Sequence, residues 1–74
     1  MALTIFFKNG KQMNGLLWSW RPKEGWFQAL NEKTGNVKRY QLKDIKGGQL
    51  WQTRDRRDNY ESLVDKAMAE GWEP

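Results

Sequence analysis

The sequence contains neither cysteine nor histidine. A disulfide is therefore excluded, and a zinc or iron–sulfur site is not expected, because thiolate and imidazole are the main ligands of those centres. The same absence removes the thiol nucleophile and the imidazole base of many hydrolases. Neither GxxxxGK[ST] nor GxGxxG occurs. We expect no metal, no cofactor and no enzymatic activity, and leave open only an active site built from Lys, Tyr and Gln at an oligomer pore.

Long apolar runs are also missing. No stretch approaches the roughly 18 residues that suggest a membrane-spanning helix. Residues 1–8 lack the basic start and the small-residue cleavage site of a secretory signal peptide. These absences predict a cytoplasmic protein without a membrane partner.

The chain has 74 residues, which predicts a single domain over residues 1–74. A domain of this size buries only about 60% of the surface that its unfolded chain exposes. Its stability must then come from packing, from a partner or from self-association. Five Trp and an aromatic content of 14% argue against a disordered chain.

The net charge of +4 is unevenly distributed. Residues 1–54 carry ten Lys or Arg against three acids, whereas residues 55–74 carry three Lys or Arg against six acids. The sequence therefore predicts a basic body followed by an acidic segment.

Alternating apolar residues predict a first strand over residues 3–7, followed by a two-residue hairpin turn at Asn9-Gly10. A second strand is expected over residues 11–21, with a bulge or bend at Gly15. Beyond Gly15, Trp18 and Trp20 share one face with Leu16, and we expect both indoles to fill the interior.

Further strands are predicted over residues 26–30, 37–42 and 49–52, with Gly47-Gly48 breaking the chain before the last. A 3₁₀ turn is expected at residues 43–45. Five short strands with turns every 8–12 residues are typical of a small antiparallel barrel or a strongly bent sheet. We predict a mainly β fold with one helix, in which residues 3–52 form a five-stranded antiparallel SH3-like barrel.

The hydrophobic period changes after residue 57, and residues 58–71 are predicted to form a C-terminal α-helix. Its apolar face would comprise Tyr60, Leu63, Val64, Ala67, Met68, Gly71 and Trp72. Asp58 and Glu61 suit a capping box at its start, and Gly71 suits a C-terminal cap. The apolar face would dock on the barrel or form a partner or dimer surface.

Two stretches give the predicted barrel a resemblance to the Sm-like proteins. Residues 7–10, Phe-Lys-Asn-Gly, followed by Gly15-Leu16-Leu17, resemble the start of the first Sm motif. Residues 45–50, Ile-Lys-Gly-Gly-Gln-Leu, resemble the second motif. Residues 18–20, Trp-Ser-Trp, stand where that family carries an Asp and a Met-Asn pair. The resemblance implies a small barrel that contacts RNA and assembles into a ring.

Clustered cations and aromatic side chains predict a nucleic-acid surface. Lys and Arg would bind phosphates with a salt-dependent affinity, and Trp26 or Tyr40 would stack on bases. The partner would be RNA or single-stranded DNA. The predicted site comprises Arg21, Lys23, Trp26, Lys38, Arg39, Tyr40 and Lys46.

An alternative is a protein-interaction module. Exposed Trp and Tyr, a free barrel edge or the helix face could dock on a larger protein, or on a second copy of the chain. Small Trp-rich domains without catalytic residues resemble adaptors and inhibitors of phage and other mobile elements. The sequence is therefore compatible with a nucleic-acid-binding module and with a protein adaptor.

Overall fold

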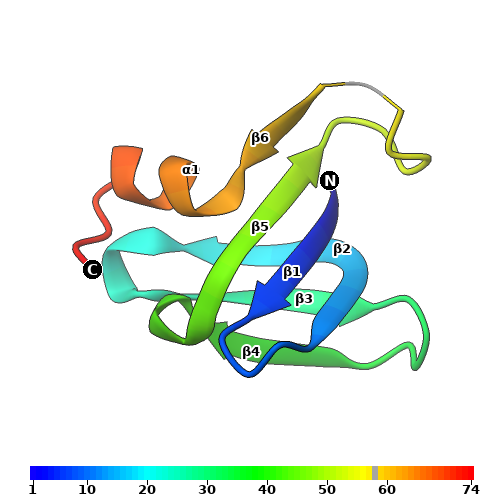
Figure 1. The fold of residues 1–74 in the computed structure, drawn as a ribbon, viewed down its shortest axis with the longest axis horizontal. Helices are drawn as coiled ribbons and strands as arrows, with labels where there is room; N and C mark the ends of the chain where they lie inside the picture. The colour runs from blue at the N-terminus through cyan, green and yellow to red at the C-terminus, as the bar shows by residue number, and fades with distance from the viewer. Residues whose placement is uncertain (58) are drawn as a thin grey trace.

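The computed structural model describes residues 1–57 and 59–74. In these residues the chain forms one six-stranded antiparallel sheet and a C-terminal helix, in the order β4-β3-β2-β1-β5-β6 (Figure 1). The elements are β1 (Ala2–Phe7), β2 (Gln12–Arg21), β3 (Trp26–Asn31), β4 (Val37–Gln41), β5 (Ile45–Trp51), β6 (Tyr60–Ser62) and α1 (Leu63–Ala69). Two 3₁₀ turns, η1 (Pro22–Glu24) and η2 (Leu42–Asp44), precede β3 and β5.

The mainly β fold with a C-terminal helix is confirmed, but the prediction of a five-stranded barrel is wrong, because the described residues form a six-stranded sheet that does not close. Strands β4 and β6 lie at the two ends of the described sheet, which is bent so that β1 and β5 cross β2, β3 and β4 (Figure 1). Strand β5 pairs with β1 along one edge and with β6 along the other. Because both edges of β5 are occupied, β4 has no edge of β5 on which to close the sheet.

The β1–β2 hairpin forms at the predicted place with a longer loop. The backbone N–H of Phe7 donates to the carbonyl O of Lys11 at 2.9 Å, and Gly10 N–H donates to Phe7 O at 3.0 Å. The hairpin loop between Phe7 and Lys11 therefore has three residues, 8–10, and not the two that were predicted. Gly10 takes the left-handed conformation, with φ of 89°, that this turn requires.

A bulge in β2 decides which aromatic side chains enter the core. Leu17 pairs with Ala29 and Ser19 pairs with Gln28, so Trp18 is one extra residue on β2. Side chains alternate between the two sides of a strand, and an extra residue exchanges the sides of everything that follows it. The predicted irregularity in this strand therefore lies three residues beyond Gly15.

The bulge separates two Trp residues that were predicted to share the interior. Trp20 turns to the side of the sheet that faces the helix, called the inner face, with its ring centroid 6.0 Å from that of Phe27. Trp18 is 63% exposed, so the prediction of a buried Trp18 is wrong. Residues Ser19 and Arg21 turn to the opposite side, called the outer face.

The core lies between the inner face and α1. Its buried members are Leu3, Ile5, Met13, Phe27, Ala29, Leu42, Ile45, Leu50, Leu63 and Ala67. Burial of these side chains on both layers supplies the main stabilisation of so small a domain. Of the predicted helix face, Leu63 and Ala67 lie in this core and Trp72 packs against it. Tyr60 and Met68 are exposed, so for these two residues the prediction of a face docked on the sheet is wrong.

Gly48 lies inside a strand at a position where a side chain would collide with the helix. The predicted chain break at Gly47-Gly48 is wrong, because both residues lie within β5. A Cβ on Gly48 would lie 3.1 Å from the Cβ of Leu63 and 3.1 Å from the carbonyl O of Thr4. The bare backbone of Gly48 therefore lets α1 pack directly on β5.

The helix begins later than predicted. Residues 60–62 form β6, and α1 runs from Leu63 to Ala69 rather than from 58 to 71. The predicted cap residue Asp58 lies outside the described residues. Ser62 is the N-cap instead, and its Oγ accepts a hydrogen bond from the backbone N–H of Asp65 at 3.3 Å.

The helix ends at the predicted glycine. Trp72 N–H donates to the carbonyl O of Ala67 at 2.9 Å, and Gly71 N–H donates to Met68 O at 3.2 Å. Gly71 has φ of 111°. This pair of hydrogen bonds is the Schellman motif, and it confirms Gly71 as the residue that ends the helix.

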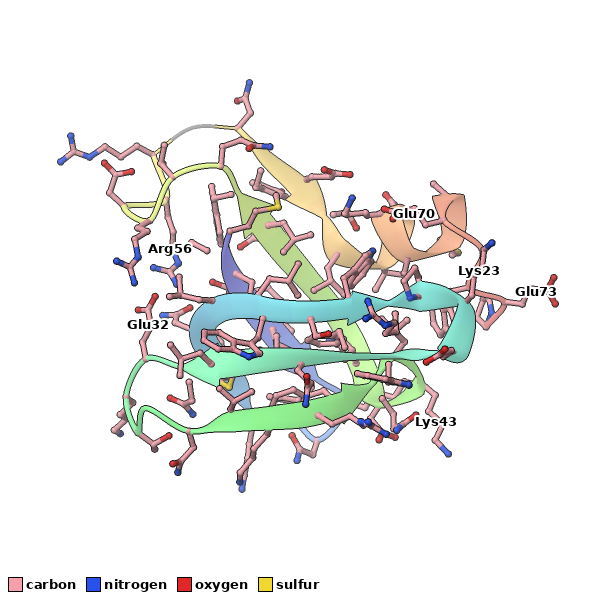
Figure 2. The ribbon with its side chains drawn as sticks, turned by 180° about the vertical axis from the view of Figure 1, so that it is seen from behind. Lys23, Glu32, Lys43, Arg56, Glu70 and Glu73 are labelled. Atoms are coloured by element: carbon pink, nitrogen blue, oxygen red, sulfur yellow. The ribbon has the colours of Figure 1, made fainter. Side chains whose placement is uncertain are left out.

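Hydrogen bonds from Arg56 connect the segment that follows β5 to the sheet. Arg56 Nη2 donates to the carbonyl oxygens of Leu3 and Gly15, both at 3.2 Å, and to Glu32 Oε1 at 3.0 Å. Figure 2 shows Arg56 and Glu32 directed toward each other. These contacts offset the cost of the left-handed backbone of Arg56, whose φ is 58°.

Glu70 joins the end of the helix to the sheet. Its carboxylate accepts from Lys66 Nζ at 2.6 Å and from Trp20 Nε1 at 3.2 Å. The hydrogen bond from Lys66 lowers the pKa of Glu70 and raises the pKa of Lys66. A carboxyl group whose pKa is lowered by folding stabilises the fold above its unfolded pKa, and this contribution is lost as the pH falls through the folded pKa.

Glu70→Gln tests this contact. We expect the melting temperature of the native chain to exceed that of the variant at neutral pH, and the difference to shrink as the pH falls below about 4.3, the ordinary pKa of Glu. Glu73→Gln is the control, because Figure 2 shows Glu73 pointing away from the molecule. A difference that does not change with pH would contradict a role for the charge of Glu70.

None of the helices in residues 1–57 and 59–74 has the length and the apolar character needed to cross a membrane.

Candidate nucleic-acid interface

Acidic residues are absent from the central strands. The five strands β1 to β5, all within the described residues, contain no Asp and no Glu. They carry four cations, Arg21, Lys38, Arg39 and Lys46, all of which belong to the site predicted from the sequence. The acids lie instead in turns, β6, α1 and the C-terminal residues. These strand cations therefore have no acidic neighbour on the same or an adjacent central strand.

The register of β2, β3 and β4 gathers three predicted residues on the outer face. Trp26 pairs with Arg21 on one side and with Gln41 on the other, and Gln28 pairs with Arg39. Paired residues point to the same side of a sheet. The five side chains therefore form one surface, called here the outer patch, on the three strands whose ribbons lie nearest the viewer in Figure 2.

Arg39 stacks on Trp26 within the outer patch. The guanidinium carbon of Arg39 lies 3.8 Å from the centroid of the indole ring. This cation–π contact holds a long side chain in one orientation. The planar guanidinium keeps donors that match the two oxygens of a phosphate, and Arg planes also stack on bases. Arg39 is thus preorganised for either kind of contact.

Arg21 lies beside this stacked pair. Its Nη1 donates to the carbonyl O of Trp20 at 3.0 Å, and the residue is exposed. The amides of Gln28 and Gln41 add donors and acceptors to the outer patch. Taken together, the outer patch offers two Arg, one aromatic ring and two amides, a set that suits phosphates and unpaired bases.

Tyr40 does not join the outer patch. It pairs with Phe27 and therefore lies on the inner face, where its ring centroid is 5.7 Å from that of Phe27 and 5.5 Å from that of Phe7. Its hydroxyl donates to the Sδ of Met13 at 3.2 Å. Partial burial raises the pKa of Tyr40. Tyr40 and Trp26 therefore cannot stack on the same base.

The remaining predicted cations are dispersed. Lys38 pairs with Ala29, so it lies on the same side of β4 as Tyr40. Lys23 lies on η1 next to the end of the helix, where its Cγ would be 2.9 Å from a Cβ on Gly71. Lys46 is exposed on β5. Of the seven predicted residues, three belong to the outer patch, two lie on the inner face of β4, and two lie on other elements.

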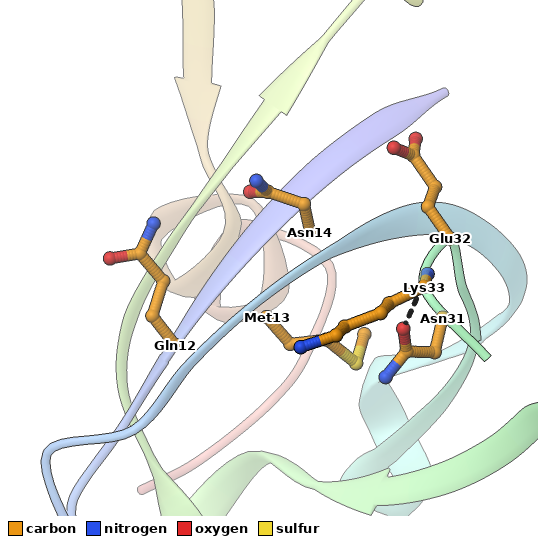
Figure 3. Close-up of a pocket in the computed structure, with 6 residues that line it drawn as sticks. All are labelled: Gln12, Met13, Asn14, Asn31, Glu32 and Lys33. Atoms are coloured by element: carbon orange, nitrogen blue, oxygen red, sulfur yellow. Dashed lines mark hydrogen bonds between the residues drawn. The ribbon is translucent and has the colours of Figure 1, made fainter.

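The structure adds a polar hollow that the sequence did not indicate. It has a volume of about 430 Å³ and is lined by Gln12, Met13, Asn14, Asn31, Glu32 and Lys33 (Figure 3). The backbone N–H of Lys33 donates to Asn31 Oδ1 at 2.8 Å. Amides at these positions carry no pattern of their own in the sequence, because the pairing of β2 with β3 brings the start of β2 beside the end of β3 and the turn that follows it.

No protein-family model, no curated protein and no solved structure matches the chain.

Proposed function

We propose that the chain is a non-enzymatic module that binds single-stranded nucleic acid through the outer patch. The observation that carries this proposal is the stacking of Arg39 on Trp26 at 3.8 Å, beside Arg21, on strands that carry no acid. A charged surface that only maintains solubility does not require a guanidinium ordered on an aromatic ring.

In this mechanism Arg21 and Arg39 hold consecutive phosphates, and an unpaired base stacks on the Arg39–Trp26 pair. Each phosphate contact on a single strand contributes about 0.7 to the slope of log affinity against log salt. Two arginines therefore supply a slope of about 1.4, and stacking supplies a part of the affinity that salt does not remove.

The resemblance to Sm-like proteins concerns the fold class alone: strands β1 to β5 would be an open form of the SH3-like small barrel. The hairpin at residues 8–10 and the pairing of β5 with β1 support this relation. The outer patch does not use the family's Asp and Met-Asn positions, so the proposed base contact is independent of the resemblance.

Fluorescence anisotropy tests the function directly. Labelled single-stranded RNA, single-stranded DNA and duplex DNA are titrated with the protein at two salt concentrations, and the Trp emission is recorded in parallel. We expect salt-dependent binding of the single strands with quenching of Trp emission. Absence of binding at low salt would overturn the proposal.

A protein partner is the second candidate, and Trp18 favours it. A Trp that is 63% exposed on a bulge has the size and rigidity of an interface anchor. Trp18→Ser should then abolish binding to a co-purified protein and leave nucleic-acid affinity unchanged. Loss of nucleic-acid binding in Trp18→Ser would instead place Trp18 in the nucleic-acid site.

A further inference from the structure

A second hollow lies on the inner side of edge strand β4. It has a volume of about 560 Å³ and is bordered by the β1–β2 hairpin and by β3 and β4. We call it the hairpin groove and define it by Asn9, Lys11, Gln12, Asn31, Lys38 and Tyr40. It shares Gln12, Met13 and Asn31 with the hollow of Figure 3, so the two hollows adjoin each other.

The chemistry of the hairpin groove matches a nucleotide. Lys11 and Lys38 are two cations, and the described lining residues include no acid. The amide Oδ1 atoms of Asn9 and Asn31 accept backbone hydrogen bonds, so these two side chains offer their N–H groups to a base edge. Gln12 adds a third amide, and Tyr40 is an aromatic surface. In the adjoining hollow the one acid, Glu32, already accepts a hydrogen bond from Arg56 at 3.0 Å. The groove therefore favours an anion that carries a base.

The hairpin groove and the outer patch are separated by a single strand. Lys38 and Arg39 are consecutive residues of β4, and consecutive side chains of a strand point to opposite sides. In the described sheet β4 pairs with β3 alone. A nucleic-acid strand that passes from Arg39 around this free edge of β4 would therefore reach Lys38 on the other side of the sheet.

The backbone of the edge adds donors along this path. Leu42 N–H donates to Gly25 O, and Asn31 N–H donates to Asn36 O, both at 2.9 Å. In an antiparallel pair of strands, hydrogen-bonded and non-hydrogen-bonded residue pairs alternate. Counting from these two bonds, Gln28 and Arg39 form a non-hydrogen-bonded pair, so the N–H of Arg39 points away from β3. Such N–H groups commonly bind phosphate oxygens.

We propose that the hairpin groove is a second subsite for the same single strand. The strand crosses the free edge of β4, with phosphates on Arg39 and Lys38 and one unpaired base in the groove beside Tyr40. Duplex DNA, with a persistence length of about 150 base pairs, cannot make this turn, whereas a single strand can. This inference rests on the proposed function and explains why single strands would be preferred.

The length of the oligonucleotide separates the two subsites. Strands of about 4 and about 12 nucleotides span the usual site sizes of small single-strand binders. We compare the native chain with the double variant Lys11→Glu, Lys38→Glu. The matched control is Arg54→Glu, Arg57→Glu, which makes the same charge change at two exposed residues of the segment 52–57, on the opposite side of the molecule from β4 (Figure 1).

Two linked subsites should make the native chain bind the longer strand at least about 30-fold more tightly than the shorter one. Relative to the control, the groove variant should retain short-strand affinity within about threefold and lose at least about tenfold for the long strand. Equal losses at both lengths, or no loss beyond the control, would overturn the second subsite and leave the outer patch intact. Failure of the native chain to bind either length would overturn the proposed function itself.

Discussion

Gly15→Ala is expected to remove a large part of the protein's stability. A Cβ at this position would lie 2.1 Å from the carbonyl O of Leu30 and 3.1 Å from its carbonyl C. Both are backbone atoms of β3, whose pairs with β2 fix them in place. The clash can be relieved only by breaking part of this ladder.

The expected loss is large compared with the stability of the domain. Overpacking against a backbone that cannot move costs about 3 kcal/mol or more. A domain of this size has roughly 4–11 kcal/mol in total. Gly15 also pairs with Leu3, and its carbonyl O accepts from Arg56, so a displaced Gly15 would weaken β1 and the β5–β6 loop as well.

Gly47→Ala is the matched control for this experiment. Gly47 also lies in a strand, but a Cβ there would meet no described atom within 4 Å. We expect its effect to stay within about 0.5 kcal/mol. Urea unfolding followed by Trp fluorescence measures both variants. Equal stability of the two would show that β2 and β3 do not approach each other closely at Gly15.

Reversing the charge of Arg21 and Arg39 is expected to weaken single-strand binding by at least about 100-fold. The double variant Arg21→Glu, Arg39→Glu removes two phosphate contacts, adds two repulsive charges and removes the cation from Trp26. The salt slope should fall by about 1.4. Anisotropy titrations at several salt concentrations give both quantities.

The control for net charge is Lys23→Glu, Lys46→Glu. These residues belong to the predicted site, but they lie outside the outer patch. The variant has the same net charge as the arginine variant, so we expect long-range repulsion alone to reduce its affinity by less than about tenfold. If both variants lose affinity equally, binding depends on total charge and the outer patch is not a site.

Local turn chemistry was predictable from the sequence. Asn9-Gly10 marked a real hairpin and Gly71 marked the end of the helix, because in each case the residue type meets a requirement of its own backbone. The break at Gly47-Gly48 was not, because the reason for Gly48 is the approach of Leu63, fifteen residues later. The local sequence of a strand does not show which other element of the fold packs against it.

The candidate site was predictable only in part, for the same reason. Arg21, Trp26 and Arg39 were selected by residue type, but their meeting depends on the register of two hairpins. Tyr40 was selected on the same grounds, yet it lies on the other side of β4. Alternation separates Tyr40 from Arg39 once the strand is placed, whereas the bulge at Trp18 has no local signal, since neither glycine nor proline stands there.

The order of the strands has a consequence for folding kinetics. Hairpins connect β1 to β2, β2 to β3 and β3 to β4, so these pairings involve neighbours along the chain. The pairing of β1 with β5 is different, because it brings Ala2 to Trp51 and Leu3 to Leu50. Closing so long a segment costs chain entropy before any contact is gained, which slows folding. We expect the four-strand meander to form early, and docking of β5, β6 and α1 onto β1 to limit the folding rate.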